Sequence, residues 1–224
     1  MSPSFFKKLG PISINQIKKT VECHTQNISD VYSFENFVSI DRISDKSLSF
    51  LYDNENLKQE LNSSSGLICS ENKYNEFTKS QRLIIVKNVQ EAVAKISNIF
   101  YSEFNTKEKD SFDEPIIGKE CEIGKNVIIE NGVKIGNNVK IAHGAIIKHN
   151  CIIGDGSIIG SNTVIANSIL GEHINVGNNT SIGQRGFGFH LKNGKNNDIF
   201  HFGKVIINSF SYGFESLCFA RIGT

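Results

Sequence analysis

The stretch that decides the fold covers residues 117–164 and divides into eight hexads: IGKECE, IGKNVI, IENGVK, IGNNVK, IAHGAI, IKHNCI, IGDGSI and IGSNTV. Isoleucine leads every hexad, and from the second hexad on the fourth place is asparagine or glycine. This period does not match an amphipathic helix, whose apolar stripe returns every 3.6 residues. An internal repeat this short indicates two-residue strands separated by turns and wound into a coil.

The other places of the hexad fit the same interpretation. Asparagine and glycine are the residues that most readily take the positive φ of a tight corner. Each coil buries its apolar side chains against its neighbours, so the stack stabilises itself repeat by repeat. The period slips once, because Ile165 to Leu170 is a step of five. We expect a corner of altered geometry there. Small residues that suit a narrow interior stand two places before each isoleucine: Cys121, Val127, Val133, Val139, Ala145, Cys151, Ser157 and Thr163.

Composition limits the classes of function. The chain has 224 residues, with 24 basic and 23 acidic side chains, so charge does not attract it to nucleic acid or to an anionic membrane. Five cysteines, an odd number and without zinc-site spacing, predict free thiols in a reducing compartment and no metal site. No signal peptide and no apolar run long enough to span a bilayer is evident. We expect a cytoplasmic protein.

Residues 1–110 contain no hexads and have the pattern of a small α/β domain. Ile14, Ile17 and Val21 recur at helical spacing, after a capping box at Ser13 and Gln16. A second amphipathic helix is predicted over residues 89–100, capped by Asn88 and Glu91. Short strands are predicted at Val38–Ile40, Leu48–Tyr52, Gly66–Cys69 and Leu83–Val86.

The predicted domain organisation follows from these patterns. Residues 1–110 form the α/β domain, and its helical end leads into a charged linker, EFNTKEKDSFDE, at residues 103–114. Residues 111–207 form the β-helix, with an excursion loop at 183–204. Residues 208–224 form a tail without hexad period.

Two stretches carry a resemblance to known families. The hexads are similar to those of the left-handed parallel β-helix acyltransferases, which have three hexads per coil; the left-handed sense rests on this resemblance alone. LSFLYDNENLKQEL (48–61) with SSGLICSE (64–71) resembles the N-terminal uridine-binding domain of the UDP-3-O-acylglucosamine N-acyltransferases of lipid A biosynthesis. That resemblance implies that Phe50 stacks on uracil and that Asn54 reads its edge. Residue type alone favours a core position for Phe50.

A third stretch, residues 182–207, looks like the loop of the same family that leaves the β-helix and returns to it. Its recognisable pieces are Gly186-Phe187-Gly188-Phe189 and His201-Phe202-Gly203-Lys204-Val205. Glycines around aromatic residues permit a backbone excursion that lays rings against a partner or an acyl chain. A loop that packs on its own side chains is the other interpretation.

The resemblance implies an enzyme that transfers a 3-hydroxyacyl chain from acyl carrier protein to a UDP-3-O-acylglucosamine. It implies a homotrimer, no metal and no organic cofactor. The family's catalytic base is a histidine in a Gln-Ile-Ala-His-Asn hexad downstream of the loop, beyond residue 224, so no catalytic residue is assigned here and we expect a truncated chain. The alternatives are an inactive remnant, a UDP-sugar-binding protein, or another hexapeptide acyltransferase.

His143, in KIAHGA, resembles that catalytic hexad locally but lies before the loop. His143 and His149 occupy the same place of consecutive hexads, so three hexads per coil put them on different sides of the prism. A site with three histidine ligands is therefore not expected. We predict that His143 is a solvent-facing turn residue.

Overall fold

The computed structural model describes residues 4–56, 63–184, 189–192, 195–198 and 202–209. They fall into two compact units. The first comprises the described parts of residues 1–6, 103–186 and 202–224, and the second those of residues 7–102 and 187–201. The chain passes from the α/β unit to the β-helix unit between Ser102 and Glu103, and the first six residues belong with the β-helix.

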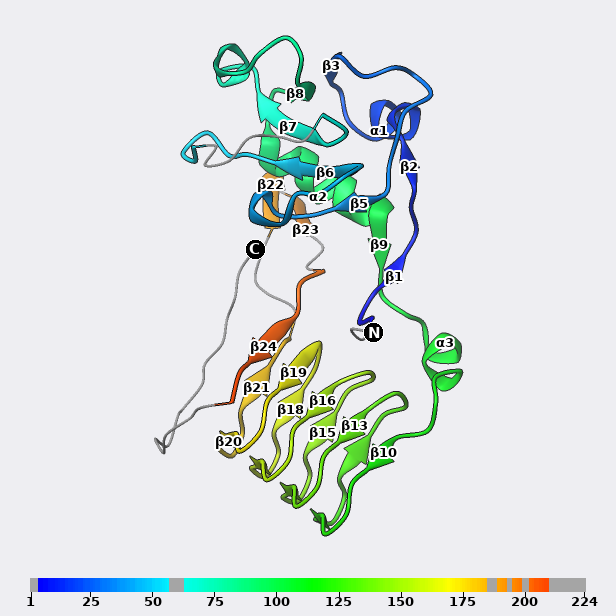
Figure 1. The fold of residues 1–224 in the computed structure, drawn as a ribbon, viewed down its shortest axis with the longest axis vertical. Helices are drawn as coiled ribbons and strands as arrows, with labels where there is room; N and C mark the ends of the chain where they lie inside the picture. The colour runs from blue at the N-terminus through cyan, green and yellow to red at the C-terminus, as the bar shows by residue number, and fades with distance from the viewer. Residues whose placement is uncertain (1–3, 57–62, 185–188, 193–194, 199–201, 210–224) are drawn as a thin grey trace. The chain divides into compact units, whose positions relative to one another are not determined.

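The first unit is a parallel β-helix, as the hexads predict (Figure 1). Ile117 is the register partner of Ile135, and Ile135 that of Ile153, so one coil takes eighteen residues or three hexads. The first sheet contains β10 (Ile116–Ile117), β13 (Lys134–Ile135), β16 (Ile152–Ile153), β19 (Ser168–Leu170) and β24 (Val205–Ile207). The second contains β11 (Glu122–Ile123), β14 (Lys140–Ile141), β17 (Ile158–Ile159) and β20 (Asn175–Val176), and the third β12 (Ile128–Ile129), β15 (Ile146–Ile147), β18 (Val164–Ile165) and β21 (Ser181–Ile182).

The interior and the corners of the β-helix follow the hexad pattern. From Ile135 to Ile165 the leading isoleucines are at most 3 % exposed, and Cys151, Ser157 and Thr163 are fully buried beside them. Every asparagine or glycine at the fourth place from Asn126 to Asn162 has a positive φ, between 55° and 78°. The prediction for these corners is confirmed.

The slip in the period lies at a corner, as expected. Asn167 there takes a φ of 47°, and the register partner of Ile153 is Leu170, seventeen residues later instead of eighteen. This coil is therefore one residue shorter than the others, and the missing residue is at the turn, so the strands stay in register.

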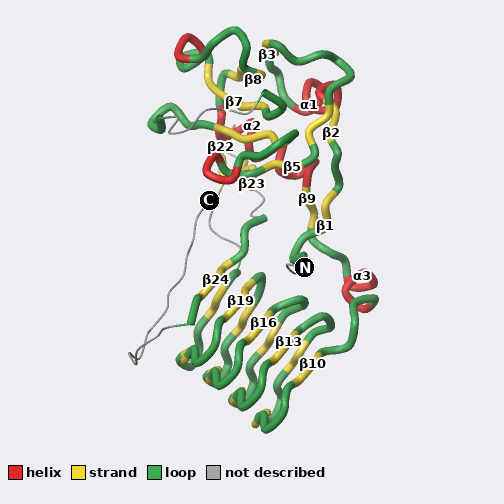
Figure 2. The backbone as a smooth tube through the Cα atoms, viewed as in Figure 1, coloured by secondary structure: helices red, strands yellow, loops and turns green. Residues whose placement is uncertain are grey.

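The second unit is built on a five-stranded sheet in the order β3-β8-β7-β6-β5 (Figure 2). Its strands are β3 (His24–Gln26), β5 (Asn36–Phe37), β6 (Ser47–Phe50), β7 (Gly66–Ser70) and β8 (Arg82–Val86). Strands β5 to β8 are parallel, and β3 pairs antiparallel with β8. The helices are α1 (Ile14–Thr20) and α2 (Val89–Phe100), with 3₁₀ turns η1 (Ile40–Arg42) and η2 (Tyr74–Glu76).

Three short antiparallel pairs complete this unit. They are β1 (Lys7–Lys8) with β9 (Tyr101–Ser102), β2 (Ile12–Ser13) with β4 (Ser33–Phe34), and β22 (Phe189–Lys192) with β23 (Lys195–Asp198). The hairpin of β22 and β23 comes from the predicted excursion loop, and the structure places it beside α2 in the α/β unit. Gly186, Phe187, Gly188 and His201 of that loop lie outside the described residues, as do residues 210–224 of the predicted tail.

Both predicted helices are confirmed, with their caps. The Ser13 side chain accepts from the backbone N–H of Gln16, and the Asn88 side chain accepts from that of Glu91. The strand predicted at Val38–Ile40 is wrong. Strand β5 ends at Phe37, whose side chain is buried in the core, whereas Val38 and Ile40 are only partly buried and the chain enters a 3₁₀ turn at Ile40.

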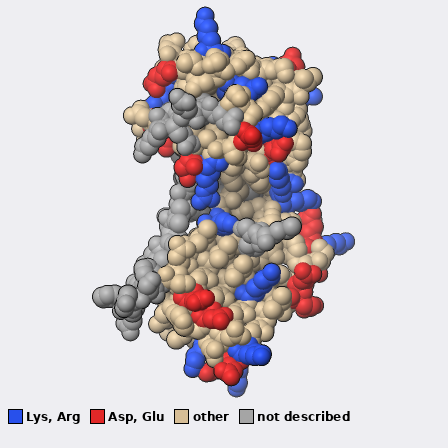
Figure 3. Space-filling view, viewed as in Figure 1, with Lys and Arg blue, Asp and Glu red and all other residues tan. Residues whose placement is uncertain are grey.

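The segment predicted as a polar linker contains a short helix, α3 (Thr106–Asp110). Asn105 and Glu108 form a capping box that satisfies its first backbone N–H groups. Within the described part of the chain, no helix has the length and apolar character to cross a membrane. Figure 3 shows acidic and basic side chains interspersed over the face in view, in keeping with a net charge of +1.

Candidate functional site

The strongest candidate site lies in the α/β unit, where β6 and β7 end. Ligands of open parallel sheets bind outside the carboxyl ends of the strands. Strand β6 ends at Phe50 and leads into a loop that carries Tyr52 and Asn54, and neighbouring β7 ends at Ser70. The segment singled out by resemblance thus lies at the edge where a parallel sheet presents its ligands.

Phe50 is a core residue, 8 % exposed. Its ring centroid lies 5.5 Å from that of Phe37, which in turn stacks on Phe100 of α2 at 5.6 Å. Most of the ring surface is therefore occupied by the core of the unit. The stacking of Phe50 on uracil stays a prediction.

Tyr52 lies next to Phe50 and was not singled out by its sequence pattern. The two ring centroids are 5.3 Å apart, and the Tyr52 side chain is partly exposed. Burial, with a smaller effect of the Glu55 carboxylate, raises the pKa of the Tyr52 phenol, so the hydroxyl stays protonated. Tyr52 presents more aromatic surface at this edge than Phe50 does. An aromatic residue just after a strand's carboxyl end is the signal that would have found it.

Asn54 is exposed at the tip of a closed turn. The backbone N–H of Tyr52 donates to Oε2 of Glu55 at 3.0 Å, and the backbone N–H of Glu55 donates to the Tyr52 carbonyl at 3.0 Å. These two bonds close the turn. The reading of a uracil edge by the Asn54 amide stays a prediction.

The end of β7 anchors this turn. Ser70 Oγ donates to Oδ1 of Asp53 at 2.5 Å, and the Lys73 ammonium donates to the backbone carbonyl of Glu55. The Lys73 side chain is 7 % exposed, and its Nζ lies 3.6 Å from a carboxylate oxygen of Glu76. Neither anchor is apparent from the sequence pattern, because the partners of Ser70 and Lys73 lie seventeen and eighteen residues away.

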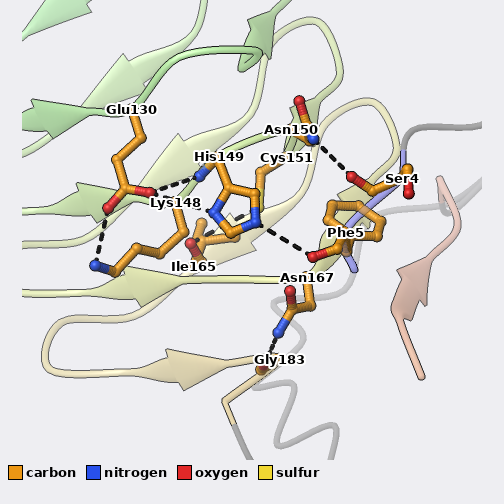
Figure 4. Close-up of polar contacts among 10 residues, drawn as sticks. All are labelled: Ser4, Phe5, Glu130, Lys148, His149, Asn150, Cys151, Ile165, Asn167 and Gly183. Carbon is orange, nitrogen blue, oxygen red and sulfur yellow. Dashed lines mark hydrogen bonds and ion pairs between the residues drawn. The ribbon is translucent and has the colours of Figure 1, made fainter. Parts of the chain in front are cut away.

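A second polar cluster lies on the β-helix around His149, which is 8 % exposed (Figure 4). The His149 backbone N–H donates to Oε2 of Glu130 at 3.0 Å, and ring atom Nδ1 lies 3.4 Å from the same oxygen. Ring atom Nε2 lies 3.3 Å from the carbonyl oxygen of Phe5. The Lys148 ammonium donates to Oε1 of Glu130 at 2.9 Å. Burial raises the pKa of the Glu130 carboxyl, but the hydrogen bonds from Lys148 and His149 outweigh burial and leave it below its usual range.

Aromatic rings enclose His149 on its other sides. The ring of Phe112 stacks on the imidazole with centroids 5.8 Å apart, and Phe104 meets it edge-on at 5.9 Å. Phe5 is 4 % exposed and belongs to the β-helix core. Asn150 also donates to the Ser4 carbonyl at 2.6 Å. His149 therefore holds the N-terminal segment and the linker against the β-helix, and its Nε2 already faces a protein carbonyl.

His143 has a different role. It is exposed, as predicted, and its Nδ1 accepts a hydrogen bond from the backbone N–H of Lys125 at 2.7 Å. The two histidines share a place in the hexad, but His143 caps a backbone corner and His149 clamps two other segments.

Comparison with known proteins concerns the β-helix. Residues 111–194 match the family model described as the GMPPB C-terminal domain. That model represents a hexapeptide-repeat-like left-handed β-helix domain of nucleotidyltransferase-related proteins. No curated protein sequence matches the chain. The match supports the class of domain that the hexads predict, and it does not extend to residues 7–102 of the α/β unit.

Proposed function

We propose that this chain is an N-acyltransferase of the UDP-3-O-acylglucosamine type. It takes a 3-hydroxyacyl chain from acyl carrier protein and places it on a UDP-linked acylglucosamine in lipid A biosynthesis. The observation that carries the proposal is the position of the loop with Tyr52 and Asn54 at the carboxyl edge of a parallel sheet, in a chain that continues into a hexapeptide β-helix.

In this proposal the α/β unit binds the uridine nucleotide. A planar base needs an aromatic surface and an amide that can read its edge, and Tyr52 and Asn54 supply the two at one turn. Phe50 supports the ring of Tyr52 from within the core.

The outer faces of the β-helix support the proposed homotrimer. Outward positions of the third sheet carry Ile128, Ile146 and Val164, and those of the first sheet include Ile152, Ile169 and Ile206. The second sheet instead carries the ion pair of Glu122 with Lys140. These two faces are largely apolar, with Lys134 as an outward charge on the first sheet, and such faces on a three-sided prism suit closure around a threefold axis.

The chemistry requires a base. The acceptor amine adds to the thioester carbonyl carbon, loses a proton to the base, and the thiolate of acyl carrier protein leaves. Nδ1 of His143 and Nε2 of His149 each face a backbone group already. We therefore assign neither histidine as the base.

The decisive experiment measures acyl transfer and nucleotide binding on the full chain. Mass spectrometry follows a 3-hydroxyacyl group from acyl carrier protein to UDP-3-O-acylglucosamine, and calorimetry measures binding of UDP and GDP. We expect binding of UDP in preference to GDP, and turnover would show that a group other than His143 and His149 serves as the base. Tyr52→Leu and Asn54→Ala weaken UDP binding, whereas Asn56→Ala, at an exposed position two residues on, leaves it unchanged.

The second candidate function is a UDP-sugar-binding protein without catalysis. It is favoured because His143 and His149 each already have a ring nitrogen facing a backbone group. Binding of UDP without acyl transfer would support it. A chain that neither binds UDP nor transfers an acyl group contradicts both functions. Preference for GDP would redirect the assignment toward another nucleotide sugar.

A further inference from the structure

Lys73 is a deeply buried charged side chain near the carboxyl ends of β6 and β7 in the α/β unit. Its ammonium donates to the Glu55 carbonyl and lies 3.6 Å from the Glu76 carboxylate, with the side chain only 7 % exposed. Taking an ammonium out of water is costly unless hydrogen bonds and opposite charge compensate it. An apolar side chain would fill the same space without this cost, so the ammonium calls for an explanation.

The Lys73 ammonium holds one side of the turn formed by residues 52–55. Ser70 fixes one side of the turn through Asp53, and Lys73 fixes the other through the carbonyl of Glu55. Ser70 Oγ also accepts from the Lys73 backbone N–H at 3.3 Å, which ties the two anchors together. Asn54 lies between the two anchored residues and is exposed.

We propose that Lys73 is a positioning residue for nucleotide recognition, which holds the turn of residues 52–55 in the conformation that binds uridine. This inference rests on the proposed function. A loop ordered before binding loses less conformational entropy when the ligand arrives, so its affinity is higher. Lys73 acts through the loop backbone and makes no contact with the ligand, because its ammonium is already bonded and enclosed.

This role has a distinctive signature. A lysine that contacts a diphosphate affects the affinity for UDP and spares that for uridine. A lysine that positions the base-reading loop affects both ligands by the same factor. The ratio of the two affinities therefore separates positioning from direct contact.

The experiment measures Kd for uridine and for UDP by calorimetry on the full chain. Lys73→Met is compared with Lys95→Met, which removes the ion pair of Lys95 with Glu91 on α2. We expect Lys73→Met to raise both Kd values by about tenfold, and Lys95→Met to leave them unchanged. Ser70→Ala removes the other anchor without removing a charged side chain, and it should also raise both Kd values. This variant provides the test if Lys73→Met does not fold.

The outcomes are distinct. Wild-type protein that binds neither ligand overturns the proposed function, and this inference with it. Wild-type binding that survives both Lys73→Met and Ser70→Ala overturns the inference alone. A loss confined to UDP overturns positioning in favour of a phosphate contact. A lower melting temperature with unchanged Kd values shows that Lys73 supports the fold only.

Discussion

The imidazole of His143 accepts a hydrogen bond at Nδ1 from the backbone N–H of Lys125, eighteen residues earlier and one coil below. Asn137 makes the same contact to the backbone N–H of Lys119 at 2.9 Å, and Asp155 to that of Asn137 at 2.8 Å. Side chains at the third place of a hexad thus cap the corner of the preceding coil. The third place therefore needs a side chain that accepts a hydrogen bond, and an imidazole, an amide or a carboxylate can each serve.

His143→Ala removes one such acceptor and leaves a backbone N–H to be satisfied by water. We expect the free energy of unfolding to fall by about 1 kcal/mol. His143→Asn keeps an acceptor and should retain most of the stability. Chemical denaturation of both variants measures the difference, and equal losses would show that the hydrogen bond is not the reason.

Corner geometry gives a second prediction. Gly132 has a φ of 78°, and a Cβ there would collide with the side-chain oxygen of Asn150. We expect Gly132→Ala to lower the free energy of unfolding by about 1–3 kcal/mol. Asn138→Gly, at a corner with a φ of 55°, serves as control and should fold normally. Thermal unfolding of the two variants checks the contrast.

The interior of the coil predicts a third contrast. Ile147 is fully buried, whereas Ile158 points outward and is 45 % exposed. Ile147→Ala leaves a cavity in a narrow core and should lower the free energy of unfolding by about 2–5 kcal/mol. Ile158→Ala should change it by no more than about 0.5 kcal/mol in the monomer. A large loss at Ile158 would point to an interface on that face.

The lowered pKa of the Glu130 carboxyl should make the stability of the protein depend on pH in the acid range. Burial opposes ionisation, but hydrogen bonds from Lys148 and from the His149 backbone hold the pKa of Glu130 below its usual range. A lowered carboxyl pKa contributes stability that is present above the ordinary value and is lost as the pH falls through the lowered one. Glu130→Gln should therefore flatten stability against pH below about pH 5. Lys140→Met, which breaks the exposed pair with Glu122, should leave that slope unchanged.

The buried thiols of Cys69 and Cys151 should resist alkylation in the folded protein. Burial raises the pKa of Cys151 to about 12 and that of Cys69 to about 11, so both remain neutral thiols at pH 8. Neither should react with iodoacetamide in the folded protein, because the thiolate is the nucleophile. Both raised values imply stability that is lost as the pH rises above the ordinary thiol pKa of about 8.5. Mass spectrometry of labelled peptides tests the reactivity, and rapid native labelling of Cys151 would contradict the buried position.

The sequence by itself determined the β-helix and the positive φ of its corners, whereas the coil of three hexads was implied by the resemblance and is confirmed by the strand register. It also determined α1 and α2, through caps such as Ser13 with Gln16. These features depend on residues close together in the chain, or on positions that the period brings together. The helix α3 was readable in the same way from Asn105 and Glu108, although it falls in a segment whose charge suggested a linker.

Only the tertiary structure decided the roles of residues whose partners have no fixed spacing. His143 and His149 occupy the same place of the repeat. Only His149 faces the backbone carbonyl of Phe5, 144 residues away, and so holds the N-terminal segment against the β-helix. Phe50 is packed against Phe37 in the core, so Tyr52 presents the partly exposed ring at the candidate site. Lys73 anchors Glu55 because β6 and β7 are neighbours in the sheet. Such contacts arise when chain folding brings distant segments together, and no local pattern encodes them.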